Sequence, residues 1–162
     1  MLAREDQTLD ALLRQRAQSA GSGARPSWEE LVRVLRDVNA GDHSAILRLP
    51  PATAQEVMRD QTARVYLRGL IYLQARDAAN AAAEFQRFLD HRGAATPSPV
   101  YPLAYVQQAR AYTLIGDQTK ARKAYQDFLA LWKDADPDVP ILREARAEYA
   151  RLTVPPDSGR QH

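Results

Sequence analysis

The sequence contains no cysteine, only three lysines and no long apolar run. A chain without cysteine has no disulfide, no thiolate zinc site and no cysteine nucleophile. No stretch approaches the roughly 18 consecutive apolar residues that a membrane-spanning helix requires, so the sequence predicts no membrane insertion. Residues 1–30 carry charges throughout and lack the unbroken apolar core of a signal peptide, which favours a cytoplasmic location.

Strand-forming residues are also scarce. The chain has 28 Ala and 18 Leu against 9 Val and 4 Ile, and this composition predicts an all-α fold. The 22 basic and 20 acidic residues nearly cancel. Because the basic residues are spread at solvent spacing along predicted helices, the charge disfavours nucleic-acid binding as the main function. A nucleic-acid or transcription-associated accessory domain stays open as the alternative function.

A break at residues 20–26 separates an N-terminal segment from the rest of the chain. Its sequence, AGSGARP, interrupts two helical patterns with two Gly, a Ser and a Pro. Residues 1–26 are therefore predicted to form a helix followed by a flexible linker. The helix is expected over residues 5–17, and its apolar stripe is too narrow to be stable alone in water. One hypothesis is that this helix docks in an apolar groove of the protein. The stripe consists of Leu9, Leu12 and Leu13.

Residues 27–60 are predicted to form accessory helices. Ser27 and Glu30 have the spacing of a capping box, and the helix that they start is predicted to end at Gly41. A second capping box lies at residues 53–56, after two prolines. Whether this region is a degenerate repeat stays open.

An internal repeat with an offset of 40 residues organises the domain predicted at residues 61–153. Residues 65–91 and 105–131 align under this offset. Six aligned pairs are identical: Tyr72 and Tyr112, Asp77 and Asp117, Ala81 and Ala121, Gln86 and Gln126, Phe88 and Phe128, and Leu89 and Leu129.

Each copy of the repeat has the pattern of a helix hairpin. Small residues at Gly69 and Ala81, and again at Ala109 and Ala121, let two helix backbones approach to about 8 to 10 Å. The aspartate of each copy lies between the two helices, where a carboxylate caps the free amides of the second helix. The sequence therefore predicts hairpins at about residues 62–92 and 99–133.

These residues resemble the tetratricopeptide repeat, a helix-turn-helix unit of 34 residues. The resemblance implies a right-handed superhelical stack of hairpins. The chain departs from the family in its spacing of 40 residues and in lacking the usual proline at the end of each unit. The matching residues are Gly69, Tyr72, Ala81 and Phe85 in the first unit, and Ala109, Tyr112, Gly116, Asp117, Ala121, Tyr125 and Phe128 in the second.

A second resemblance covers residues 64–152. RVYLRGLIYL, AAAEFQRFLDHRG and YQDFLALWKDADPDVPILREARAEYARL are similar to the carboxy-terminal repeat module of bacterial eukaryotic-like serine/threonine protein kinases. In that family the module is an interaction region and catalysis lies in a separate kinase domain. This sequence has no His-Arg-Asp or Asp-Phe-Gly motif, so the kinase activity is not carried over. The resemblance implies a noncatalytic accessory of a bacterial signalling kinase.

Other chemical motifs are incomplete. Asp134, Asp136 and Asp138 have the spacing of the first half of a calcium loop, but Val139 and Ala145 stand where the loop requires Gly and Glu. The three histidines are far apart and form no zinc motif. We therefore predict no catalytic residues, no metal site and no cofactor.

A final helix from residue 140 to residue 152 is predicted to cap the stack, and residues 154–162 are predicted to be a disordered tail. One face of the helix is apolar, while its arginines are expected to face water together with Glu144 and Glu148. The apolar face consists of Ile141, Leu142, Ala145, Tyr149 and Leu152, and the arginines are Arg143, Arg146 and Arg151.

A concave groove is the predicted binding site. In stacked hairpins the first helix of each unit lines a concave surface that can hold a peptide or a helix of a partner protein. Arg110 is expected to meet a carboxylate of that partner. The alternative, that several of these side chains pack against a neighbouring helix, stays open. The predicted groove residues are Tyr66, Leu70, Leu73, Gln74, Val106, Gln107, Arg110 and Thr113.

Overall fold

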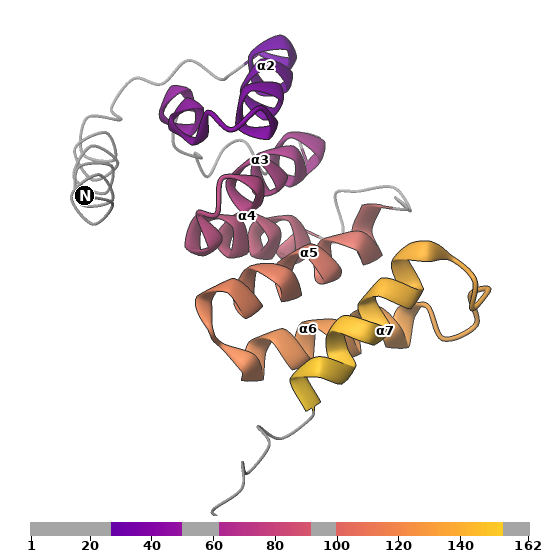
Figure 1. Cartoon of the computed structure of the whole chain (residues 1–162). Coiled ribbons are helices and arrows are strands. Elements are labelled where there is room, and N and C mark those ends of the chain that lie inside the picture. The colour runs from indigo at the N-terminus through magenta and orange to yellow at the C-terminus, as the bar shows by residue number, and fades with distance from the viewer. Residues whose placement is uncertain (1–26, 50–61, 92–99, 154–162) are drawn as a thin grey trace, which may run out of the picture.

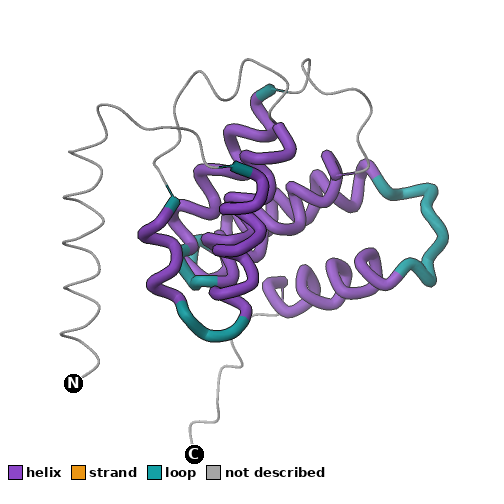
Figure 2. The backbone as a smooth tube through the Cα atoms, turned by 90° about the horizontal axis from the view of Figure 1, so that it is seen from above, coloured by secondary structure: helices purple, strands orange, loops and turns teal. Residues whose placement is uncertain are grey.

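The computed structural model describes residues 27–49, 62–91 and 100–153 (Figure 1). Within these ranges all regular structure is helical, and the connections between helices are loops and turns (Figure 2). The all-α prediction is confirmed for this part of the chain. No helix among the described residues is long and apolar enough to cross a bilayer. The predictions for residues 1–26, 53–56 and 154–162 lie outside the described residues.

The first described helix, α2 (Trp28–Asn39), has the predicted ends. The backbone amide of Glu30 donates to Ser27 Oγ at 3.1 Å, which caps the helix. The helix ends before Gly41, whose φ of +97° lies in the left-handed region that glycine adopts without steric cost. The next element, η1 (His43–Arg48), is a 3₁₀ helix of six residues. The described part of this region is therefore not a hairpin of two α-helices.

The two predicted hairpins are present (Figure 1). The first pairs α3 (Thr62–Gln74) with α4 (Ala78–Asp90), and the second pairs α5 (Val100–Ile115) with α6 (Gln118–Leu131). Asp77 caps α4 by accepting from the amide of Asn80, and Asp117 caps α6 by accepting from the amide of Lys120. The capping prediction for both aspartates is confirmed.

The small residues of the repeat lie at the helix contacts. Gly69 is buried on α3, and a Cβ atom built there would meet the Phe85 ring of α4 at 2.7 Å, so even alanine does not fit without a shift. In the second hairpin Ala109 and Ala121 are both fully buried. The predicted register of the two hairpins is therefore confirmed.

The hydrophobic core has two clusters that meet at Tyr105 of α5, which packs against both. The first cluster joins α2 and η1 to α3, α4 and one face of α5, so the core extends across the boundary predicted near residue 60. The second joins α5, α6 and the last helix, α7 (Pro140–Thr153). The first cluster includes Leu31, Val34, Ile46, Val65, Ile71 and Phe85, and the second includes Val106, Ala124, Phe128, Leu142 and Ala145.

The helix α7, yellow in Figure 1, lies against α5 and α6. Its predicted apolar face is confirmed, since Leu142 and Ala145 are buried and the other three members pack against the second core cluster. Arg143, Arg146 and Arg151 are exposed as predicted. The prediction for Glu148 is wrong, because its side chain is only 27% exposed.

Candidate functional site

A pocket of about 430 Å³ runs over α3, α5 and α7, and we refer to it as the groove. These are the first helices of the two hairpins and the helix that follows them. Three leucines and three uncharged polar side chains supply part of its wall, and α6 contributes Tyr125. The lining residues are Leu73, Gln74, Gln107, Arg110, Thr113, Leu114, Tyr125, Glu148, Arg151 and Leu152.

Five of the predicted groove residues line this pocket: Leu73, Gln74, Gln107, Arg110 and Thr113. The structure brings them together from α3 and α5 although they are more than thirty residues apart in sequence. Leu114 is 44% exposed and adds apolar surface beside them.

Val106 does not face the groove. It is completely buried in the second core cluster with Phe128 and Leu142. The prediction placed it on the surface because repeat positions indicate which face of α5 it occupies, but not that α6 and α7 cover this face. The alternative that some of these side chains pack against a neighbouring helix is thus correct for Val106.

Tyr66 and Leu70 support the first core cluster and do not line the groove. The Tyr66 ring lies 5.7 Å from the ring of Phe85 and 5.5 Å from that of Phe88. Burial raises the pKa of the Tyr66 hydroxyl, and a hydrogen bond with Gln107 opposes this effect. Tyr66 therefore joins the core to the edge of the groove through Gln107.

Arg110 lines the groove and is paired within the chain. Its Nη2 atom lies 2.9 Å from Glu148 Oε1 and 2.9 Å from Glu144 Oε2, and its Nε atom donates to Glu148 Oε2 at 3.0 Å. Burial acts to lower the pKa of Arg110, but the two glutamates outweigh it and the pKa is raised. A carboxylate of a partner would therefore have to compete with two carboxylates of α7.

Tyr125 completes this cluster from α6. Its hydroxyl donates to Glu148 Oε2 at 2.7 Å. Burial raises the pKa of Tyr125, and the bond to the glutamate raises it further. Glu148 therefore accepts hydrogen bonds from two different helices, and these bonds hold α7 at the end of the groove.

The 40-residue offset contains a signal for this cluster that the sequence analysis missed. Applied to α3, α5 and α7, it aligns Arg68, Gln108 and Glu148. All three are polar, the first two are buried, and Glu148 is mostly buried. A polar residue that recurs at one position of an otherwise apolar helix face indicates a buried polar interaction. Burying a polar group without a hydrogen-bond partner is costly, so such a residue is expected to have one.

The acidic turn before α7 is exposed. Asp136 Oδ1 accepts from the backbone amide of Asp138 at 2.9 Å, and Asp134 is 89% exposed. Within the described ranges, no group of three or more His, Asp or Glu side chains is arranged to hold a metal ion.

No protein-family model, no curated protein and no solved structure matches this chain.

Proposed function

We propose that this protein is a noncatalytic protein-interaction module. In this proposal its helices form a tetratricopeptide-like right-handed stack, and the groove binds a peptide or a helix of a partner protein. The main support for this proposal is the pocket of about 430 Å³ that crosses α3, α5 and α7. A site that spans several stacked helices suits an elongated ligand.

The composition of the groove supports a protein ligand. Leu73, Leu114 and Leu152 offer apolar surface for an aliphatic or aromatic anchor. Gln74 and Gln107 each present an amide that both donates and accepts, as a peptide group does. The charge of Arg110 is matched by glutamates of α7, so the exposed Arg151 is the groove cation that is available to a ligand among the described residues.

On the resemblance alone, the partner belongs to a bacterial signalling kinase or its regulators, and the module acts as their accessory. The alternative function, a nucleic-acid-associated domain, has less support. Residues 102–133 are the most basic part of the chain, yet Arg110, Lys120 and Lys123 in it are each paired with a carboxylate. Fewer free cations remain there to contact phosphates.

Selection of linear peptides from a displayed library on the immobilised protein tests the proposal. We expect enriched peptides to compete with one another and to lose at least about tenfold in affinity for the Leu114→Glu variant, since a charge in an apolar pocket must be desolvated. Leu131→Glu is the matched control, because Leu131 has the same 44% exposure and lies outside the groove. The proposal is wrong if both variants bind the peptides as the unchanged protein does, or if both lose binding equally.

A further inference from the structure

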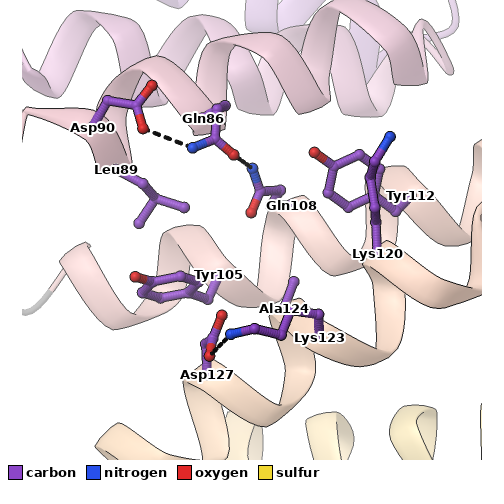
Figure 3. A pocket seen from close by; sticks show the side chains of 10 residues that line it. All are labelled: Gln86, Leu89, Asp90, Tyr105, Gln108, Tyr112, Lys120, Lys123, Ala124 and Asp127. Carbon is purple, nitrogen blue, oxygen red and sulfur yellow. Dashed lines mark hydrogen bonds and ion pairs between the residues drawn. The ribbon is translucent and has the colours of Figure 1, made fainter.

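A second pocket, of about 410 Å³, lies between α4, α5 and α6 (Figure 3). None of its lining residues lines the groove. Its volume is within the range of about 300 to 1,000 Å³ that is usual for small-ligand sites. This pocket is therefore a separate candidate binding site.

The repeat explains why this space exists. In the first hairpin, Arg68 Nε lies 3.3 Å from Glu84 Oε2, and both side chains are almost completely buried. Forty residues later the same two positions are Gln108 and Ala124, and both line the pocket. The second hairpin thus has neither the guanidinium nor the carboxylate that fill this position in the first, and the short side chain of alanine leaves space.

A relay of hydrogen bonds determines what the pocket presents to a ligand. The Gln86 amide nitrogen donates to Asp90 Oδ1 at 2.7 Å, and the Gln108 amide nitrogen donates to Gln86 Oε1 at 2.8 Å (Figure 3). Because a carboxylate only accepts, Asp90 orients both amides in one direction. The carbonyl oxygen of Gln108 is therefore left facing the pocket.

The carbonyl oxygen of Gln108 is an acceptor that is open to the pocket. Gln108 is only 4% exposed, and its carbonyl oxygen accepts no hydrogen bond from any residue that the structure describes. A ligand that donates a hydrogen bond to this oxygen can do so without displacing a donor of the protein. The ligand of this pocket is thus a hydrogen-bond donor.

The charges around the pocket favour a cation. Lys120 is paired with Asp117 at 3.0 Å, and Lys123 is paired with Asp127. Asp90 receives a hydrogen bond only from a neutral amide among the described residues. Both lysines of the lining are thus paired with an aspartate, and Asp90 is the lining carboxylate that has no cationic partner among the described residues.

We propose that this pocket binds a guanidinium group. A guanidinium offers five donors in a plane, is weakly hydrated, and stacks on aromatic rings. The pocket has an acceptor oxygen, the carboxylate of Asp90 and the ring of Tyr105, while the ring of Tyr112 already lies under the ammonium of Lys120, 5.5 Å from its centroid. In the first hairpin the chain itself places the guanidinium of Arg68 at the corresponding position. The ligand supplies to the second hairpin the group that its own sequence lacks.

Titration of the full chain with arginine amide, followed by NMR of the glutamine side-chain amides, tests this assignment. We expect saturable binding with a Kd near about 1 mM. Citrulline amide, whose ureido group has the same shape without the charge, should bind at least about tenfold more weakly. Acetyl-Gly-Arg-Gly amide separates two sources of the same group: tighter binding than arginine amide indicates an arginine side chain of a peptide, and weaker binding indicates a free guanidino compound.

Three variants locate the site. The double variant Gln108→Arg with Ala124→Glu restores the pair of the first hairpin within the chain, and it should fold and lose at least about tenfold in affinity for arginine amide. Asp90→Asn should also weaken binding, whereas Asp134→Asn, at an exposed aspartate outside the pocket, should leave it unchanged.

The proposal is overturned by the absence of a saturable response up to about 50 mM arginine amide. Equal affinities for arginine amide and citrulline amide would also overturn it, as would undiminished binding to the folded double variant. Since the two pockets share no residue, Leu114→Glu should not affect this titration, and failure of the groove proposal leaves the result intact.

Discussion

Arg110 of α5 and Glu148 of α7 are 38 residues apart in sequence, and the guanidinium donates to both oxygens of the carboxylate at 2.9 and 3.0 Å. Both side chains are 27% exposed, so solvent screens the pair only in part. This pair connects the last helix to the hairpin before it and at the same time neutralises the charge of Arg110, so Arg151 is the groove cation that has no carboxylate partner among the described residues.

Glu148→Gln should destabilise the protein by about 1 to 3 kcal/mol, because a partly buried Arg110 and the hydroxyl of Tyr125 both lose a charged acceptor. Chemical denaturation measures the change. Glu144→Gln is the control, since Glu144 is 58% exposed and contacts the same arginine, and we expect a change within about 0.5 kcal/mol. Equal losses for the two variants would contradict the special role of Glu148.

The turns of the two hairpins differ at equivalent positions, 76 and 116. Arg76 has a φ of +62°, in the left-handed region, whereas Gly116 has a φ of +88° at the matching position. An L-residue pays about 1 to 2 kcal/mol for this conformation. Arg76→Gly should therefore stabilise the protein by about 0.5 to 1 kcal/mol, after the greater freedom of glycine in the unfolded chain is counted.

Gly116→Ala is the reciprocal experiment. A Cβ atom at Gly116 has no neighbour within 4 Å, so its effect reports the backbone conformation alone. We expect a loss of about 1 kcal/mol in thermal or chemical denaturation. A stabilising Gly116→Ala would show that this turn does not require the left-handed conformation.

Ala121→Leu should destabilise the second hairpin by about 1 to 3 kcal/mol, because Ala121 is fully buried at the contact between α5 and α6 and larger side chains there overpack the core. Ala130→Leu, at an exposed position of the same helix, is the control. Denaturant midpoints that agree for the two variants would contradict the helix register.

The lowered pKa of Asp117 predicts that the stability of the fold depends on pH. The amide and the ammonium of Lys120 both donate to its carboxylate and hold its pKa below the usual value of 3.8. A folded-state pKa that is depressed means that the stabilisation is present above the unfolded pKa of about 3.9 and is lost as the pH falls through the folded value. As the pH is lowered from 6 to about 2, the melting temperature of the unchanged protein should therefore fall more steeply than that of the Asp117→Asn variant. Parallel pH profiles would exclude this carboxylate as a source of the acid sensitivity.

The helix α2, the four helices of the two hairpins and α7 were predictable from the sequence, whereas the 3₁₀ helix η1 was not. Capping depends on residues three apart, as for Asp77 and Asn80, and such contacts are formed within one turn of chain. The close contact of Gly69 with α4 follows from the order of small and large side chains in the repeat. These features are local or are repeated at the 40-residue offset, so the sequence by itself determined them.

The tertiary structure alone decided which polar groups are buried and which are free. Periodicity identifies the helix face that carries Val106, Arg110 or Glu148, but it does not identify the helix that lies opposite that face. The hydrogen bond between Gln86 and Gln108 joins residues 22 positions apart on different hairpins, and the bonds of Glu148 join three helices. Burial and charge pairing depend on such contacts between distant segments, because the cost of desolvating a polar group is offset only by the partner that packing brings to it.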